Sequence, residues 1–545
     1  MNQQINEKKT QSTEKTGELR TLVNFRPVLF CAFFFAFGVW FYKQCRCGVS
    51  PLWTLLAVLP FFSLLLFRDK QRLLRTLYRT LAIVCAFFCG IGAFALQVFC
   101  YESGGRYNGE YFVVGIVDEY ALEGEVCRVV LSDLEIDGNT EKGALVAYLP
   151  YTYAEKLTLN DRLALHGKVK RSALDFEDPY FAYTVEKDLR FDMNAQSVTT
   201  LGNDFRLFPF LREKITDVLY AGLDETTAAV TMALLTGDVR AIDDGLLDNV
   251  RYGGIAHVFA VSGLHVGVLY GFCLWLMNRK GLKRLPKPFK IAFVALTLLF
   301  YGGVCGYSSS IIRATVTCLI AYGAKLVGLN TDSGESIGAS ALVVTAFSPI
   351  SLFTAGFQLS FAACFGIVWL SKPIEKLLLK PLPVLEDGEE PPLSIFQTTK
   401  RKALQFFAVT LSAQIATSPI QILSFGYLSV WSVFLNILFV PLISALFSIL
   451  LALVTLSCIL PVAWTSIILY IPNVLWTVLL LAFEVLDFSK NAITGITLNG
   501  PIVTCYYLIC LFMTDKLRLP KKIKIYLAFF CALVLLLSVH ILSVV

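Results

Sequence analysis

Long apolar runs separated by short basic loops fill most of this 545-residue chain and restrict it to membrane folds. Three runs lie near 27–42, 52–67 and 80–100, and others follow from about residue 230 to the end. Charged residues make up 16% of the chain, against about a quarter in soluble domains, and the mean hydropathy is +0.64. The sequence therefore predicts a polytopic α-helical membrane protein.

Residues 101–200 differ from the rest of the chain. They hold 10 Lys and Arg against 18 Asp and Glu, a net charge of −8 in a chain whose total is +6. Apolar and polar residues alternate in 111–117, 127–131 and 162–169, with turn residues between them. Short strands separated by turns are typical of a small barrel or sandwich. We therefore expect a small β domain over 101–202, inserted between membrane helices.

The positions of the basic residues indicate how the chain is oriented in the membrane. Lys and Arg are dense in the polar tail 1–24 and again between the second and third apolar runs, and such clusters are usually held in the cytoplasm. Three membrane helices within 25–100 would then place the β domain outside. Cys100 and Cys127 lie outside the apolar runs, and in an oxidising compartment they are candidates for a disulfide.

The C-terminal part has the same alternation of basic loops and apolar runs. Basic clusters lie at 279–290, at 372–380 with 400–402, and at 515–524. Four spans are expected between the first two clusters, and about four more between the second and third. The first four lie near 291–306, 309–327, 336–352 and 354–371. These even numbers keep the basic clusters on one side, and a last run at 525–545 would leave the C-terminus outside.

A helical pattern over 205–223 follows the β domain, with Leu207, Leu211 and Ile215 on one face. Two interpretations remain open: a helix on the outer membrane surface, or an amphipathic helix packed on the bundle. The next charged segment contains four acids and two bases. It either lines a pore mouth or is a solvated helical face, and its charged residues are Asp238, Arg240, Asp243, Asp244, Asp248 and Arg251.

Four sequence blocks resemble the ComEC family of competence proteins. They are HVFAVSGLHV (257–266), GYSSSIIRA (306–314), SPISLFTAGFQLSF (348–361) and LSAQIATSP (411–419) with Phe425-Gly426, Asn436 and Pro441 after it. In the third block, Ser348 stands where the family usually has Asn. The resemblance implies a channel domain over 205–545 that passes single-stranded DNA through the plasma membrane. It also implies that the β domain is an OB-like barrel.

Polar residues inside apolar runs are the candidates for the DNA path, because such residues usually face the interior of a bundle or a water-filled cavity. The set is His257, Ser262, Gly263, His265, Arg313, Gln358, Gln414 and Asn436. Each has a structural alternative. The histidines can be hydrogen-bonded within the bundle, Arg313 can snorkel to the surface, and the amides can join helices. Gly263 is expected to break or bend a helix.

In the β domain, aromatic and basic residues are candidates for contact with single-stranded DNA. They are Tyr151, Tyr153, Lys168, Lys170 and Arg171. The acidic net charge opposes DNA binding, so docking of a protein partner is an alternative function.

No catalytic site, metal site or cofactor is expected. The four histidines, His166, His257, His265 and His540, are scattered and cannot form the metal cluster of the metallo-β-lactamase-like domain found in many ComEC relatives. No nucleotide-binding glycine-rich loop is present either. The resemblance therefore implies a short family form that depends on a DNA receptor, a separate nuclease and a cytoplasmic helicase-like motor. Transport of another anion and a non-conducting scaffold remain alternative functions.

Overall fold

The computed structural model describes residues 26–46, 70–123, 126–259, 261–328, 332–379, 394–485, 488, 492–496, 498, 500–514, 523 and 525–527. The predicted tail 1–24, the apolar run 52–67, and most of 515–524 and 525–545 lie outside these residues. The chain divides into two compact units. The larger comprises Val28–Phe361 and Leu428–Ile493, and the smaller comprises Met1–Pro27, Ala362–Tyr427 and Thr494–Val545.

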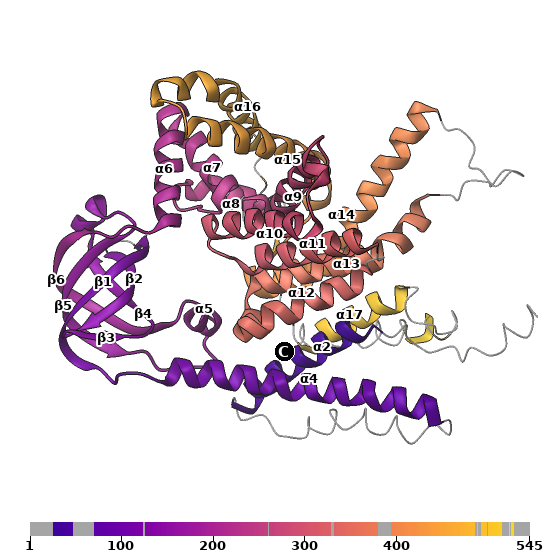
Figure 1. Ribbon diagram of the computed structural model, residues 1–545, viewed down its shortest axis with the longest axis horizontal. Helices are drawn as coiled ribbons and strands as arrows, with labels where there is room; N and C mark the ends of the chain where they lie inside the picture. Colours follow the sequence, from indigo (N-terminus) through magenta and orange to yellow (C-terminus); the bar gives the residue numbers. More distant parts are fainter. Residues whose placement is uncertain are drawn as a thin grey trace, which may run out of the picture. The chain divides into compact units, whose positions relative to one another are not determined.

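Among the described residues, nine helices are long and apolar enough to cross a membrane, which confirms the polytopic helical fold. The helices that contain these spans are α2 (Pro27–Arg46), α4 (Lys70–Glu102), α9 (Gly263–Met277, a span that begins at Ala256), α10 (Lys287–Val304), α11 (Ser309–Val327), α13 (Ala355–Leu378), α14 (Ile395–Phe425), α15 (Ser432–Ser457) and α16 (Thr465–Val485, a span that begins at Val462) (Figure 1). Shorter helices are α7 (Glu225–Thr236), α8 (Asp244–Tyr252) and α17 (Gly500–Met513).

The predicted span 336–352 is wrong in its length. This segment forms α12 (Ser333–Phe347), a helix of 15 residues, followed by the short 3-10 helix η6 (Pro349–Phe353). Asp332 begins α12 by accepting hydrogen bonds from the backbone N–H groups of Gly334 and Glu335. Fifteen residues rise about 22 Å, which is short of the roughly 30 Å hydrocarbon core. Proline at 349 prevents the helix from continuing regularly.

A small β domain follows α4 and precedes α6 (Leu207–Gly222) in the chain, as predicted (Figure 1). Its sheet has six strands in the order β1-β5-β6-β4-β2-β3, and β1 also pairs with β2. The strands are β1 (Asn108–Glu123), β2 (Val126–Ile136), β3 (Asn139–Glu141), β4 (Ala144–Pro150), β5 (Asp161–Arg171) and β6 (Leu189–Asn203).

The OB-like barrel implied by the family resemblance is not confirmed. In this sheet β1 pairs with both β5 and β2, β4 and β6 run parallel, and the three-residue strand β3 pairs with β2. Its alternating residues form an apolar core that includes Leu131, Leu145, Leu165 and Phe191. The observed domain is therefore a small curved sheet around this core, and a second cluster of Val130, Ala144, Val146 and Leu189 buries part of its other face.

The candidate disulfide is absent. Cys100 and Cys127 are both free thiols in the structure. Cys127 is fully buried in the core of the β domain, whereas Cys100 is exposed near the end of α4. Cys127 occupies an inward-facing position in the alternation of β2, where its side chain packs as a small apolar residue. Burial also raises the pKa of this thiol, so it is a poor nucleophile for disulfide exchange.

Close contact between α2 and α4 depends on two glycines. A Cβ atom built on Gly38 would lie 2.1 Å from the carbonyl oxygen of Phe87, and one on Gly90 would lie 2.1 Å from that of Phe35. Small residues let membrane helices approach through their backbones in this way. At the start of α2, the Glu335 carboxylate accepts hydrogen bonds from the N–H groups of Val28 and Leu29 at 3.0 and 3.2 Å.

Arg171 fixes the junction between α4 and the β domain. Its guanidinium donates hydrogen bonds at 2.7–3.3 Å to five successive carbonyls at the end of α4, those of Tyr101, Glu102, Ser103, Gly104 and Gly105. Arg190 adds a bond of 2.7 Å to the Ser103 carbonyl and is itself paired with Asp188. A cation here also compensates the negative end of the helix dipole.

Replacing Arg171 by alanine should therefore destabilise the protein by about 1–3 kcal/mol, since the helix-end carbonyls lose a charged donor. Thermal unfolding of the purified protein measures the loss. Lys168→Ala is the matched control, because it removes a cation from an exposed position on the same strand. Equal unfolding temperatures for the two variants would contradict this role of Arg171.

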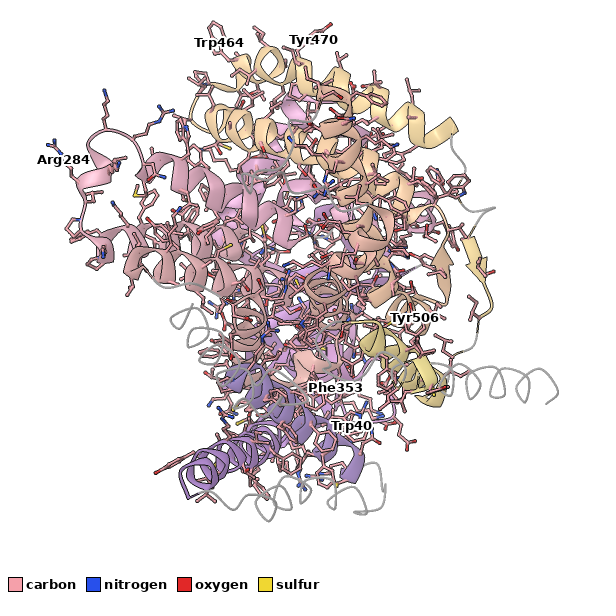
Figure 2. All side chains as sticks on the ribbon, turned by 90° about the vertical axis from the view of Figure 1, so that its right-hand side faces the viewer. Trp40, Arg284, Phe353, Trp464, Tyr470 and Tyr506 are labelled. Atoms are coloured by element: carbon pink, nitrogen blue, oxygen red, sulfur yellow. The ribbon has the colours of Figure 1, made fainter. Side chains whose placement is uncertain are left out.

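The helical pattern predicted over 205–223 forms α6 (Leu207–Gly222). It packs against α7, α10 and α16, which supports the interpretation as an amphipathic helix on the bundle. Phe208 lies where a side chain on Gly303 would otherwise be, and Arg212 donates a hydrogen bond of 2.6 Å to the Val304 carbonyl at the end of α10. The basic connection between α9 and α10 contains the 3-10 helix η5 (Leu282–Arg284), and Arg284 projects away from the helices (Figure 2).

Candidate functional site

The segment Ser262-Gly-Leu-His265 begins helix α9. Ser262 is the N-cap, and its hydroxyl accepts a hydrogen bond from the N–H of Leu264 at 3.3 Å. The backbone N–H of Ser262 donates in turn to Nδ1 of His265 at 3.0 Å. This reciprocal arrangement is a capping box, in which two otherwise unpaired helix-end donors are satisfied. The Ser–His pair thus has a structural role in starting the helix.

His265 is completely buried, and its ring packs on Phe447 with the ring centroids 4.4 Å apart. His257 lies in the separate 3-10 helix η4 (Ala256–Val258) and is exposed. The two histidines therefore belong to different elements, because α9 begins only at Gly263. The break expected near Gly263 is therefore a helix start, placed between η4 and α9.

Arg313 lies in the second turn of α11 and points toward α9 and α13. Its Nε donates a hydrogen bond of 2.8 Å to Ser360 Oγ, and its guanidinium carbon lies 5.8 Å from the centre of the Phe361 ring. A Cβ atom built on Gly263 would lie 2.8 Å from Arg313 Nη2. The side chain is half-buried between these helices.

Four predicted path residues therefore come together with two residues of α13. We call Ser262, Gly263, His265, Arg313, Ser360 and Phe361 the α9 site. It combines the positive end of a helix dipole with a guanidinium, and both attract anions. The turn before α11 helps to place Arg313, because Gly306 and Tyr307 both adopt left-handed backbone angles, with φ of 76° and 52°.

Gly263 is the position where this contact can be tested with a minimal change. Gly263→Ala would place a methyl group within 2.8 Å of the Arg313 guanidinium, so the arginine must move while the helix itself gains a better helix former. We expect unchanged stability, within about 1 kcal/mol, but weakened function. Gly267→Ala, on the same helix with no atom near its Cβ position, should leave function unchanged in a DNA-uptake assay. Equal uptake by both variants would contradict the contact.

The three predicted amides each donate a hydrogen bond to a residue close by in the chain. Gln358 donates to the Leu352 carbonyl at 3.1 Å, Gln414 to Gln421 on the same helix at 3.1 Å, and Asn436 to Ser432 on the same helix at 3.2 Å. Ser432 in turn lies 3.5 Å from the Gly254 carbonyl. Gln414 belongs to the smaller unit, and Gln358 and Asn436 lie outside the α9 site.

The charged segment before η4 is paired within itself. Asp238 accepts hydrogen bonds from Arg240, Asp243 caps α8, and Asp248 pairs with Arg251 at 2.9 Å. Burial acts to raise the pKa of Asp238, but the hydrogen bonds and charge of Arg240 outweigh it and hold the pKa below its usual value. Arg240 also lies over the Tyr120 ring of β1, with 5.2 Å between the guanidinium carbon and the ring centre. These pairs favour the interpretation as a surface segment.

The β-domain candidates divide into two groups. Tyr151 and Tyr153 are exposed on the 3-10 helix η3 (Tyr151–Lys156), and Lys168 and Lys170 are exposed on β5. Arg171, by contrast, donates its guanidinium hydrogen bonds to carbonyls at the end of α4. A role for Arg171 in contact with DNA would have to compete with these bonds and stays a prediction.

Sequence reasoning missed one exposed aromatic pair. Phe112 on β1 faces His166 on the neighbouring strand β5, with ring centroids 4.4 Å apart, and 63% of the Phe112 surface is exposed. Lys168 lies two residues along β5 from His166, on the same outward face. The signal that could have revealed this pair is the outward position of Phe112 in the alternation of apolar and polar residues along β1.

Residues 234–519 match the family model described as competence protein, which covers just over half of the chain. The chain belongs to the competence protein family. ComE operon protein 3 of Bacillus subtilis (strain 168) is 31% identical over 231 residues, which cover 42% of this chain and 26% of that protein. This supports membership of the ComEC group. The α9 site falls within residues 234–519, which the family model matches.

A second relative is the uncharacterized protein MG316 homolog of Mycoplasma pneumoniae, 28% identical over 168 residues. This match covers 30% of the present chain and 42% of the relative. The matches thus span less than half the length of either relative. The family and the nine apolar helices make this competence protein a multi-pass protein of the plasma membrane.

Proposed function

We propose that this competence protein forms the path by which single-stranded DNA crosses the plasma membrane during natural transformation. Membership of the family supports a role in DNA uptake. The α9 site is the single observation that supports a path through the membrane. There a half-buried guanidinium lies against the start of a helix, among membrane spans.

The chemistry of the α9 site suits a phosphodiester. A guanidinium among apolar helices is costly unless it is paired or hydrated, and Arg313 donates a hydrogen bond to the Ser360 hydroxyl on α13. A guanidinium at this position attracts anions, and the start of α9 beside it does the same. A planar guanidinium also matches the geometry of phosphate oxygens better than an ammonium does. Each passing phosphate would be stabilised briefly and then released.

The β domain would receive the strand on the outer side. Phe112 and His166 offer a stacking surface for a base, and Lys168 offers a charge for the adjoining phosphate. The acidic charge of the domain would disfavour duplex DNA at a distance, because duplex binding depends on neutralising many phosphates. In the proposed orientation, the N-terminus would lie in the cytoplasm, and the β domain and the C-terminus would lie outside.

The protein would act without catalysing a reaction, since Ser262 and His265 are committed to the helix cap. Strand separation, nuclease action and the driving force would then belong to partners: a DNA receptor, a separate nuclease and a cytoplasmic helicase-like motor. Transport of another anion fits the α9 site equally well, and family membership is what favours DNA.

Uptake of labelled DNA tests the proposal. A strain that lacks the gene is compared with the same strain carrying the wild-type gene, and DNA is measured on the cell surface and in a nuclease-protected cytoplasmic pool. We expect the deletion to abolish the protected pool while surface binding persists. Normal protected DNA in the deletion strain would reject the path and favour transport of another anion or a scaffold.

A further inference from the structure

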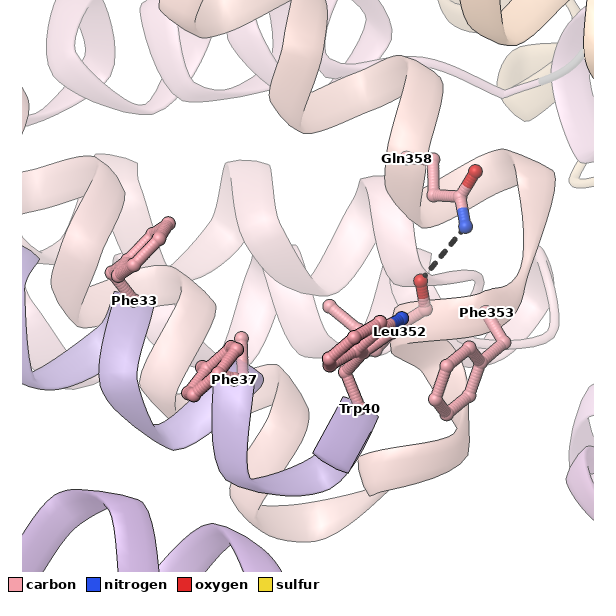
Figure 3. Close-up of a pocket in the computed structure, with 7 residues that line it drawn as sticks. Phe33, Phe37, Trp40, Leu352, Phe353 and Gln358 are labelled. Atoms are coloured by element: carbon pink, nitrogen blue, oxygen red, sulfur yellow. Dashed lines mark hydrogen bonds between the residues drawn. The ribbon is translucent and has the colours of Figure 1, made fainter. Parts of the chain in front are cut away.

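An apolar pocket of about 300 Å³ lies between α2 and the segment that leads into α13 (Figure 3). One wall is the face of α2 that carries Phe33, Ala36, Phe37 and Trp40, and the other is formed by Leu352 and Phe353 of η6, with Gln358. These α2 positions recur at helical spacing, so they share one side of a helix that is apolar enough to cross a membrane. The volume is at the lower end of the range for ligand pockets.

The pocket lining is almost entirely apolar and aromatic. Phe37 and Trp40 stack with their ring centroids 5.7 Å apart, and Phe33 is 63% exposed at the open side. Gln358 is the one polar lining residue, and its amide nitrogen already donates to the Leu352 carbonyl (Figure 3). A polar ligand would therefore find few partners here, whereas a hydrocarbon chain would bury its surface against the rings.

A positive charge stands beside one end of the pocket. Lys43 Nζ lies 5.0 Å from the centre of the Phe353 ring, which lines the pocket, and 3.7 Å from that of Phe181 in the β domain. Lys43 is one turn beyond Trp40 on α2, at the end of the helix where the β domain lies. Apolar walls and an ammonium at one end are complementary to an amphiphile with an anionic head.

We propose that this pocket binds one acyl chain of an anionic phospholipid, with the headgroup phosphate beside Lys43. The lipid belongs to the leaflet on the side of the β domain. Phe33, Phe37 and Trp40 contact the chain, and Lys43 selects the anionic headgroup, as basic residues near a membrane surface do. The bound lipid would fix α2 against η6, which is joined directly to the helix that carries Ser360 and Phe361.

Native mass spectrometry of the full-length protein tests this site. The detergent-purified protein is exchanged with phosphatidylglycerol or phosphatidylcholine, and the lipid that is retained is counted. We expect wild type to retain one phosphatidylglycerol and to prefer it over phosphatidylcholine. Ala36→Phe fills the pocket and should abolish retention. Ala292→Phe, which adds the same bulk at an exposed position of α10, should retain the lipid.

Lys43→Gln tests recognition of the headgroup separately from binding of the acyl chain. It keeps the test decisive if Ala36→Phe fails to fold. This variant should still retain a lipid but lose about fivefold of the preference for phosphatidylglycerol. The site is overturned if wild type retains no lipid, if folded Ala36→Phe retains it as wild type does, or if Lys43→Gln keeps the full preference.

Discussion

Arg313→Ala should lower the transfer of labelled DNA into the protected pool by about ten- to a hundredfold, with normal amounts of protein in the membrane. The guanidinium is the charged group of the α9 site, and a charge-assisted hydrogen bond to a phosphate contributes about 1.5–3 kcal/mol. Losing it raises the barrier at the point where the strand passes among apolar helices. Surface binding of DNA should be unchanged, because the β domain is intact.

Two further variants distinguish charge from geometry. Arg313→Lys keeps the charge but not the planar fork, and it should restore only part of the transfer. Arg284→Ala removes an arginine from the exposed connection between α9 and α10 and should leave transfer at the wild-type level. Full activity of Arg313→Ala at normal protein levels would remove Arg313 from the path.

Gly90→Ala should lower the stability of the protein by about 1–3 kcal/mol, because its methyl group would meet the Phe35 carbonyl at 2.1 Å. A backbone carbonyl cannot rotate away as a side chain can, so α2 and α4 must separate. The higher helix propensity of alanine offsets at most about 1 kcal/mol of this cost. The unfolding temperature of the purified protein measures the effect.

Gly92→Ala is the matched control, since it lies on the same helix with no atom within 4 Å of the Cβ position. It should be neutral or slightly stabilising. If Gly90→Ala were as stable as Gly92→Ala, the close approach of α2 and α4 through their glycines would be wrong. The same comparison also tests whether α2 is held in the position that the lipid pocket requires, because α2 forms one wall of that pocket.

The membrane architecture and the place of the β domain follow from composition and periodicity, which depend on local sequence. The apolar runs at 309–327 and near 291–306 became α11 and α10 nearly as expected. The run 336–352 did not, because hydropathy averages over a window and misses the helix end before Pro349. The strand order β1-β5-β6-β4-β2-β3 joins distant segments, and no local pattern specifies it.

The α9 site was predicted residue by residue but not as an arrangement. Motifs pointed to Ser262, His265 and Arg313, yet only tertiary packing shows that Gly263 lies against Arg313 and that Ser360 is its partner. His265 was considered as a pore residue because a histidine in an apolar run is unusual. Its capping role depends on where the helix starts, and that start could not be placed within one turn from sequence.

The rival functions predict different responses to the same variants. A scaffold would tolerate Arg313→Ala and Gly263→Ala, since neither change should disturb packing by much more than about 1 kcal/mol. A transporter of another anion would be impaired by both changes but would leave DNA uptake unaffected. The DNA path requires that uptake respond to Arg313→Ala and Gly263→Ala and remain normal in Gly267→Ala and Arg284→Ala.

Photo-crosslinking of DNA in transit is the most direct measurement of the central claim. A photoreactive amino acid replaces Leu264, an exposed residue next to Gly263, or Leu296, which is 71% exposed on α10 as the control. Cells are illuminated during uptake of labelled DNA. The account predicts that labelled single strands attach to the protein at 264 and not at 296. Adducts at neither position, during uptake that proceeds normally, would contradict a path past the α9 site.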